Sequence, residues 1–153
     1  MRQRAMGFTM VEMMIVLVIL AILAAVAAPS MGAAIRTQRV KTASFNVFSS
    51  LLLARSEAVK RNTSVTITPS GGNWANGWTV ADANSNTLRN AAGVSNITIS
   101  GPASVTYSGN GRLSPVGTAV QFSMSASDVL TMNQRCIKVT SSGSPISNEG
   151  PCS

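Results

Sequence analysis

Few residues of this chain could do chemistry, and their types exclude several classes of activity. The sequence has no histidine, which removes His-based acid–base catalysis and every metal site that needs an imidazole. Asp82 and Asp128 stand far apart, each beside turn-forming residues, so we expect solvated loop acids; a paired catalytic dyad is the alternative. No nucleophile motif surrounds any serine. The sequence therefore predicts a protein that is not an enzyme and has no catalytic residue, metal or cofactor.

The two cysteines, Cys136 and Cys152, are the next candidates for chemistry. In an exported protein, an even number of cysteines, one of them beside the carboxyl end, is typical of a disulfide. The bridge would close a loop of about 15 residues and contribute roughly 3 kcal/mol in the chain-entropy model. The alternative is a pair of free, buried thiols, which fits a cytosolic protein better. We favour the disulfide.

Glu12 is the only charge in an otherwise apolar segment. Residues 13–28 are all apolar, and a helix over 8–28 would be about 31 Å long, enough to cross a bilayer core. Thr9 and Glu12 fit the S/T-x-x-E capping box, and a carboxylate in the first turn also interacts favourably with the helix dipole. Pro29 removes a helical N–H, so we expect it to kink or end the helix.

Three interpretations of this segment compete. Arg2 and Arg4 before the apolar run, with Ala25-Val26-Ala27 near its end, fit a cleaved secretory signal peptide. A plain membrane anchor is the second interpretation. Neither explains a carboxylate inside the run, where a charge costs roughly 2.5–3.5 kcal/mol at the helix centre and less near an end. The third interpretation comes from the six residues that end at this carboxylate.

The hexapeptide Gly7-Phe8-Thr9-Met10-Val11-Glu12 resembles the processing site of type IV prepilins and pseudopilins. In that family a short basic leader ends in Gly, Phe usually follows, and Glu is the fifth residue after the cut. The resemblance implies that prepilin peptidase cuts after Gly7 and methylates the amino group of Phe8, so that the apolar helix is retained. It also implies an assembly role for Glu12, with Pro29 at family spacing. The carboxylate would pair with the Phe8 amine of a neighbouring subunit and set the register.

Helical spacing resumes after Pro29 and continues to Asn62, where we expect the helix to end. Apolar residues recur every three or four positions, which predicts an amphipathic helix that lays its apolar face on a sheet. Residues 53–62, then Asn73-Trp74 and Gly77–Val80, resemble the GspH/FimT (FimU-like) branch of pilin-like proteins. The two tryptophans are expected in the core. The apolar face of the helix is expected to consist of Phe45, Phe48, Leu52 and Val59, with Ala43, Val47, Leu51 and Ala58 beside them.

Short runs with alternating apolar residues follow, separated by turn residues such as Gly71-Gly72 and Gly109-Asn110-Gly111. The predicted fold is α+β and pilin-like: a long amino-terminal helix, half transmembrane and half amphipathic, packed on a small antiparallel β domain of two sheets. The runs predict strands over residues 65–68, 78–80, 97–100, 105–107, 120–124 and 136–139. The expected divisions are a leader over 1–7, a transmembrane or filament-core helix over 8–28, its amphipathic continuation over 29–62, and a β-rich globular domain over 63–153.

A net charge of +7 leaves the partners of the chain open. A basic exported domain could face anionic lipid, an acidic partner subunit or nucleic acid. The candidates for nucleic-acid contact are Arg112, Arg135 and Lys138. DNA-binding members of the FimT group carry a Gly-Arg-x-Arg loop near the carboxyl end, but Gly143–Ile146 has no arginine and Gly111-Arg112 supplies half the motif. DNA binding therefore stays open and is not favoured.

Three roles follow from the resemblance. A minor pilin would help to start a type IV pilus near its tip, a GspH-type pseudopilin would sit near the tip of a type II secretion piston, and a FimT-like pilin would take up DNA. The basic charge and the cysteine pair resemble the pilus branch, so we expect the first. The implied partners are major and minor pilins or pseudopilins, prepilin peptidase and the inner-membrane assembly platform. The implied location is the bacterial inner membrane, crossed once, with the carboxyl-terminal domain in the periplasm before assembly into a pilus or pseudopilus.

Overall fold

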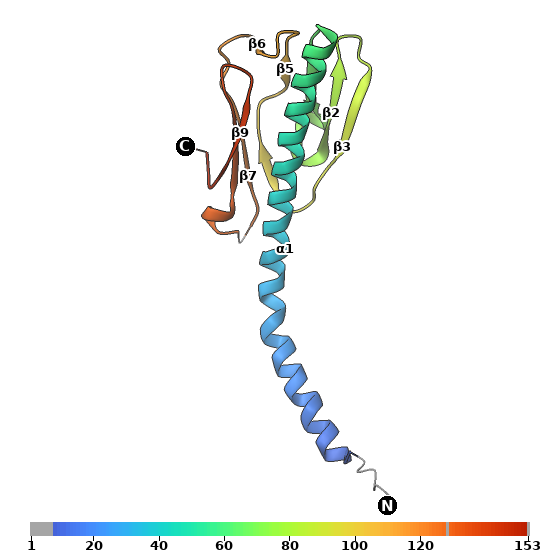
Figure 1. Cartoon of the computed structure of the whole chain (residues 1–153). Helices are drawn as coiled ribbons and strands as arrows, with labels where there is room; N and C mark the ends of the chain where they lie inside the picture. The colour runs from blue at the N-terminus through green and yellow to red at the C-terminus, as the bar shows by residue number, and fades with distance from the viewer. Residues whose placement is uncertain (1–7, 128, 153) are drawn as a thin grey trace, which may run out of the picture. The chain divides into compact units, whose positions relative to one another are not determined.

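The computed structural model describes residues 8–127 and 129–152, and over residues 26–30 it describes the backbone alone. These residues form one long helix and two antiparallel sheets, which confirms the predicted α+β class (Figure 1). The chain divides into two compact units, Met1–Ala34 and Ile35–Ser153. Within the described residues, no helix combines the length and the apolar character that a membrane crossing needs.

Helix α1 runs without interruption from Met10 to Arg61. Its backbone stays helical through Pro29. We expected a kink or an end of the helix there, and the prediction of an end is wrong. A proline inside a helix removes one N–H bond, but the turns on both sides keep their own hydrogen bonds and can hold the helix together. The apolar amino-terminal half and the amphipathic half are therefore parts of one element.

The carboxyl end of α1 is closed by its own backbone. Asn62 adopts a left-handed conformation with φ 49°. The N–H groups of Asn62 and Thr63 donate to the carbonyls of Val59 and Ala58, each at 3.2 Å. This is the Schellman arrangement, in which a residue with positive φ turns the chain back on the last helical carbonyls. The predicted end of the helix at Asn62 is confirmed.

Each of the two sheets is wholly antiparallel. Sheet A has the order β3-β2-β1-β5-β6 and sheet B the order β4-β7-β8-β9. Sheet A consists of β1 Val65–Pro69, β2 Gly77–Asp82, β3 Thr87–Ala92, β5 Val105–Tyr107 and β6 Leu113–Ser114. Sheet B consists of β4 Thr98–Ser100, β7 Val120–Ser125, β8 Arg135–Val139 and β9 Pro145–Glu149. Short 3-10 turns occur at Ser70–Gly72, Trp74–Asn76 and Thr131–Asn133.

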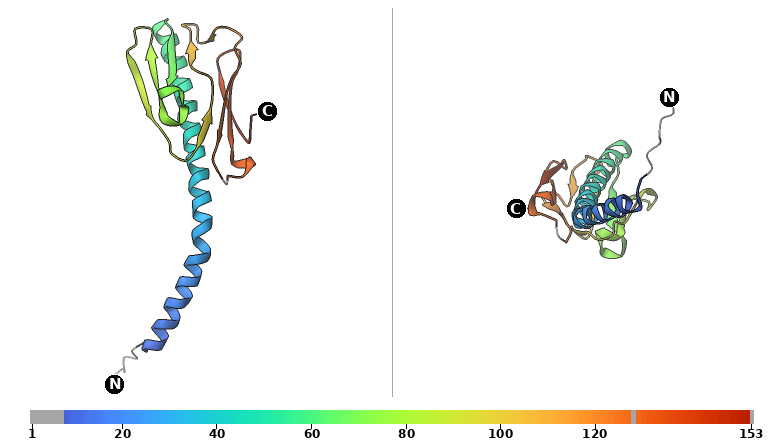
Figure 2. Two further views of the ribbon diagram at one scale, coloured as in Figure 1. Left: turned by 180° about the vertical axis from the view of Figure 1, so that it is seen from behind. Right: turned by 90° about the horizontal axis from the view of Figure 1, so that it is seen from below.

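The core lies where both sheets meet the part of α1 that belongs to the second unit, which they flank in Figures 1 and 2. Trp78 is fully buried, and its indole N–H donates to the Ser50 hydroxyl of α1 at 2.9 Å. Trp74 donates to the Pro102 carbonyl at 2.8 Å and meets Phe122 edge-on, with ring centroids 4.8 Å apart. Both indoles thus have apolar neighbours and a satisfied N–H, so the prediction that they pack in the core is confirmed.

The face of α1 that packs on the sheets is only in part the predicted one. Ala43, Val47, Leu51 and Ala58 are buried as expected. Phe45, Leu52 and Val59, expected to point inward, are 68%, 43% and 52% exposed, and Phe48 is only partly buried. The helix carries two apolar stripes side by side, and periodicity alone does not say which of them is buried. The stripe with the smaller side chains is the buried one, which allows a close approach of helix and strands. It consists of Val40, Ala43, Val47, Leu51, Ala54 and Ala58.

The six predicted strands are confirmed as β1, β2, β4, β5, β7 and β8, and three strands were missed. The sequence of β3 has little alternation of apolar and polar residues, and β6 has only two residues. Strand β9 is exposed along most of its length. All three lie at the edge of a sheet, where one side of the strand makes no ladder and the apolar pattern weakens.

Two adjacent leucines of α1 test which face is buried. Leu51→Ala should lower the free energy of unfolding by about 2–5 kcal/mol, because it leaves a cavity at a fully buried site. Leu52→Ala, at a partly exposed site, should cost below about 1 kcal/mol. Urea unfolding of the detergent-solubilised chain, followed by the fluorescence of the two buried tryptophans, measures both. Equal losses would contradict the assignment of the faces.

Candidate functional site

The amino-terminal end of α1 presents the predicted processing and assembly residues. Phe8 is 76% exposed and Glu12 is exposed in the first turn of the helix. The Thr9 hydroxyl accepts a hydrogen bond from the Glu12 N–H at 3.2 Å, which is one half of the predicted capping box. Gly7, with the rest of the leader, lies outside the described residues. The helix thus starts two residues after Phe8 and holds the carboxylate within one turn of it.

The segment that follows Glu12 is apolar on every side. From Met13 to Ala25 each residue is exposed, on all faces of the helix. The predicted assembly residue Pro29 lies beyond this stretch, and its side chain is outside the described part. A helix that is apolar all round is normally covered by other protein or by lipid. An exposed apolar surface of this extent marks an interaction site, and Glu12 is the one charge on it.

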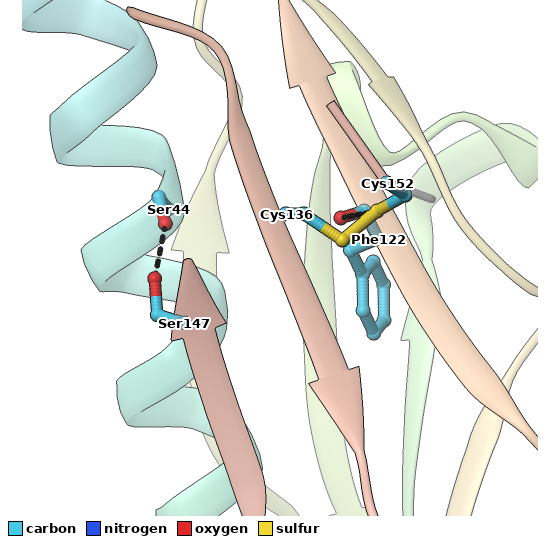
Figure 3. The surroundings of a disulfide bond; sticks show 5 residues. All are labelled: Ser44, Phe122, Cys136, Ser147 and Cys152. Carbon is cyan, nitrogen blue, oxygen red and sulfur yellow. Dashed lines mark hydrogen bonds between the residues drawn. A yellow bond between two sulfur atoms is a disulfide. The ribbon is translucent and has the colours of Figure 1, made fainter. Parts of the chain in front are cut away.

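The predicted disulfide is present. Cys136 and Cys152 are bonded, with their Cα atoms 5.1 Å apart, and Figure 3 shows the bridge beside Phe122. The Cys152 sulfur lies 3.3 Å from the Phe122 carbonyl oxygen, a contact rather than a hydrogen bond because a disulfide sulfur has no proton. The Gly150 N–H donates to the Gln134 carbonyl at 2.8 Å. The bridge therefore fastens the carboxyl-terminal tail to sheet B.

The three candidate nucleic-acid residues do not gather into one patch. Arg135 begins β8 on the face that also carries Ile137, and its guanidinium pairs with Glu149 on β9 at 2.7 Å. Lys138 lies three positions after Arg135 in β8, and an odd spacing in a strand puts its side chain on the opposite face. Arg112 is exposed in the turn between β5 and β6, near the turn that follows the far end of β8.

Arg55 has a role that the sequence analysis missed. Its Nε donates to the Gly111 carbonyl at 3.1 Å, and a terminal nitrogen donates to the Ser142 carbonyl at 3.2 Å. Gly111 belongs to the β5–β6 turn of sheet A and Ser142 to the β8–β9 turn of sheet B. The Gly143 backbone, with φ 82°, packs closely against Gly111. One side chain of α1 thus ties together the turns of both sheets, an arrangement that only tertiary structure creates.

Asp82 is not the solvated loop acid that the sequence predicted. Its side chain is 5% exposed and accepts hydrogen bonds from Asn84 N–H at 3.0 Å and Asn86 N–H at 2.9 Å. Arg61, at the end of α1, contacts it at 3.2 Å. Hydrogen bonds from Asn86, aided by Asn84 and the Arg61 charge, lower the pKa of the carboxyl below its usual 3.8. Asp82 therefore shapes the β2–β3 turn and joins it to the helix.

Catalytic and metal-binding chemistry has no support in this arrangement. Asp128, the other acid of the considered dyad, lies outside the described residues. Among the residues that are described, no group of three or more His, Cys, Asp or Glu side chains could hold a metal ion.

Comparisons with known proteins agree with these features. The family model of type II transport protein GspH matches residues 44–143, and the prokaryotic N-terminal methylation motif matches residues 2–28. Two crystal structures of the type IV minor pilin FimU of Pseudomonas aeruginosa, in space groups P65 and P21, share the fold. Both are 22% identical to this chain and cover 74% of it; the chain matches 98% and 90% of their lengths, with TM-scores of 0.64 and 0.61. No curated protein sequence is detectably similar.

An exposed apolar helix headed by a methylation motif and joined to this two-sheet domain defines a type IV pilin-like protein. The GspH match spans more than half of the chain, and the chain belongs to the GspH/FimT family of pilin-like proteins. It is a structural subunit rather than an enzyme.

The Asp82 contacts predict a pH dependence of stability. A carboxyl whose pKa is lowered in the folded state stabilises the fold above its unfolded pKa, and this contribution is lost as the pH falls through the folded pKa. Asp82→Asn should therefore reduce the urea midpoint at pH 7, and the gap to the wild type should narrow as the pH falls below about 4. Midpoints measured from pH 7 to pH 3 test this. A gap of constant size would show that the charge of Asp82 contributes nothing.

Proposed function

We propose that the chain is a minor pilin of a type IV pilus, which joins the filament near its tip and helps to start assembly. One observation carries the proposal: a helix that is exposed and apolar on every side from Met13 to Ala25 begins beside Phe8 and Glu12 and continues into the globular domain. The methylation motif and the FimU-like fold support a filament subunit over a simple membrane anchor.

The proposed route to the filament starts with processing. Prepilin peptidase removes the leader over residues 1–7 and methylates the new amino group of Phe8. The chain then crosses the inner membrane once through residues 8–28, with the amphipathic helix over 29–62 and the β domain over 63–153 in the periplasm. The assembly platform transfers it from the bilayer into a filament with other major and minor pilins. Lipid covers the apolar helix before assembly, and neighbouring helices cover it afterwards.

Glu12 and Phe8 form the proposed assembly contact. In a filament core with little water, an unpaired carboxylate is costly, and a protonated amine is its natural partner. Methylation leaves the charge on that amine. The buried pair contributes little net stability, but it fixes the register between subunits because any other register leaves both charges unpaired. Pro29 lies in the same helix, and we assign it to the adjustment of the helix during packing.

A type II secretion pseudopilin is the second candidate, because the matching family model describes a type II transport protein. The likeness to a minor pilin fold and the disulfide near the carboxyl end favour the pilus. DNA uptake ranks below both, since Arg135 is paired with Glu149 and Lys138 lies on the other face of β8. A gene neighbourhood of pilus or of secretion components separates the first two roles.

Substitution of Glu12 tests the filament role. Glu12→Ala should leave the amount of chain in the membrane unchanged, because it removes a polar group from an apolar helix. Recovery in sheared pili should fall by roughly tenfold, the effect of losing one charge-assisted hydrogen bond. Glu12→Gln, which keeps the size but not the charge, should fall as well. Normal recovery of the Ala variant in pili would reject the pairing and leave Glu12 only its helix-capping position.

A further inference from the structure

The connection between β7 and β8 is longer than its strands require. The two strands pair antiparallel, with Met124 opposite Arg135, and a hairpin of this kind is usually closed by about two to five residues. Here the connection consists of residues 126–134, which we call the β7–β8 loop. Leu130 and Met132 of this loop are 64% and 70% exposed, and neither belongs to the core. The packing of the domain therefore gives no reason for the extra length.

The β7–β8 loop lies at the end of the second unit at which α1 enters it (Figure 1). Arg135, which follows the loop, and Lys41 of α1 line the same hollow of about 250 Å³. Ser125, which precedes the loop, pairs with the start of β4, three residues after Ser95. The Ser95 carbonyl accepts a hydrogen bond from Arg39 of α1 at 3.3 Å. Both ends of the loop thus lie close to this part of α1.

The charges at this end of the second unit are mostly positive. Lys41 is exposed and forms no ion pair with any acid that the structure describes. Arg39 donates to a neutral carbonyl group, and Glu149 of β9 is already paired with Arg135 at 2.7 Å. Asp128, which lies outside the described residues, is the one acid in the sequence of the loop. Exposed apolar side chains are thus combined with an excess of positive charge.

We propose that the β7–β8 loop binds the surface of an anionic lipid bilayer, with Leu130 and Met132 among the acyl chains and Lys41 beside the phosphate groups. The inference rests on the proposed function, since it concerns the chain while α1 anchors it in the membrane before assembly. Apolar side chains bind a bilayer in proportion to the area that they bury, and each cation near an anionic surface adds to the attraction. The bound loop would hold the second unit against the membrane.

The course of the chain favours a bilayer over another protein as the occupant. No charged residue lies between Glu12 and Arg36, so no charge keeps the bilayer surface away from the start of the second unit. Lys41 follows Arg36 by five residues, or about 8 Å along a helix. The headgroup layer on each side of a bilayer is about 5–8 Å thick. An anchored chain therefore brings this end of the second unit to the level of the headgroups.

A fluorescent label between the two apolar side chains tests the proposal on the full chain. The chain is purified from membranes with its disulfide intact and reconstituted into phosphatidylcholine vesicles, with or without phosphatidylglycerol. Some of the lipids carry a nitroxide quencher near the top of the acyl chain. Thr131→Cys supplies the only free thiol for a nitrobenzoxadiazole label. Ala83→Cys is the matched control, exposed in the β2–β3 turn that Arg61 joins to the carboxyl end of α1.

We expect the label at position 131 to be quenched several times more than the label at position 83, and more strongly with phosphatidylglycerol present. In those vesicles Lys41→Gln should lower the ratio of bound to free loop by about fivefold, the effect of one cation near an anionic surface. Leu130→Ser combined with Met132→Ser should reduce the quenching to the level of the control position. Val116→Ser, a similar change at an exposed site of another loop, should leave the quenching unchanged.

Equal quenching at positions 131 and 83, the result expected if protein rather than lipid covers the loop, would overturn the inference. Quenching that responds neither to phosphatidylglycerol nor to Lys41→Gln would overturn the anionic surface as the partner. Recovery of the unlabelled Thr131→Cys chain in sheared pili is measured in parallel and separates the two proposals. A chain that is quenched in vesicles but absent from pili keeps the membrane contact and rejects the filament role. A chain that enters pili without quenching in vesicles does the reverse.

Discussion

The packing of one face of α1 between two sheets is the contact on which the rest of the second unit depends. Val47 and Leu51 of that face share a core with Trp78 of sheet A and Phe122 of sheet B. Arg55 then ties the turns of both sheets to the same helix. Only one face of this helix packs in the core. Because the stripe with the smaller side chains packs inward, the larger Phe45, Leu52 and Val59 stay exposed.

The amino-terminal unit presents the opposite case, a segment of α1 that is apolar on every side. Every described residue from Met13 to Ala25 is exposed, and no rotation of the helix would hide this surface because all of its faces are apolar. Such a surface is normally covered by other protein or by lipid. Glu12 restricts which molecules can cover this surface. A buried carboxylate needs a positively charged or hydrogen-bonding partner within reach. Helix α1 thus combines a face that is packed in the core of the second unit with an apolar segment that needs other molecules to cover it. A filament subunit needs both.

The sequence predicted those features whose signal is local. The Gly7–Glu12 pattern, the period-two strands, the cysteine pair and the end of the helix at Asn62 each depend on a few adjacent residues. The errors concern features that only the tertiary structure decides. Phe45 and Leu52 were placed inward because large apolar side chains at helical spacing look like a core, whereas sheet packing selected the stripe with more alanine. Asp82 looked like a solvated loop acid until Arg61, 21 residues earlier, was brought to it. No sequence pattern indicated the role of Arg55, because its acceptors are backbone carbonyls of two turns that are distant in the sequence.

The identity of the mature amino terminus tests the central claim most directly. If α1 is retained for assembly, intact-mass and amino-terminal peptide analysis of the chain purified from membranes will find N-methylated Phe8 as the first residue, followed by the whole apolar helix. A mature chain that begins at or near Ala28, after the Ala25-Val26-Ala27 site, would have lost Glu12 and the apolar surface together. That result would contradict the assignment of this chain as a filament subunit.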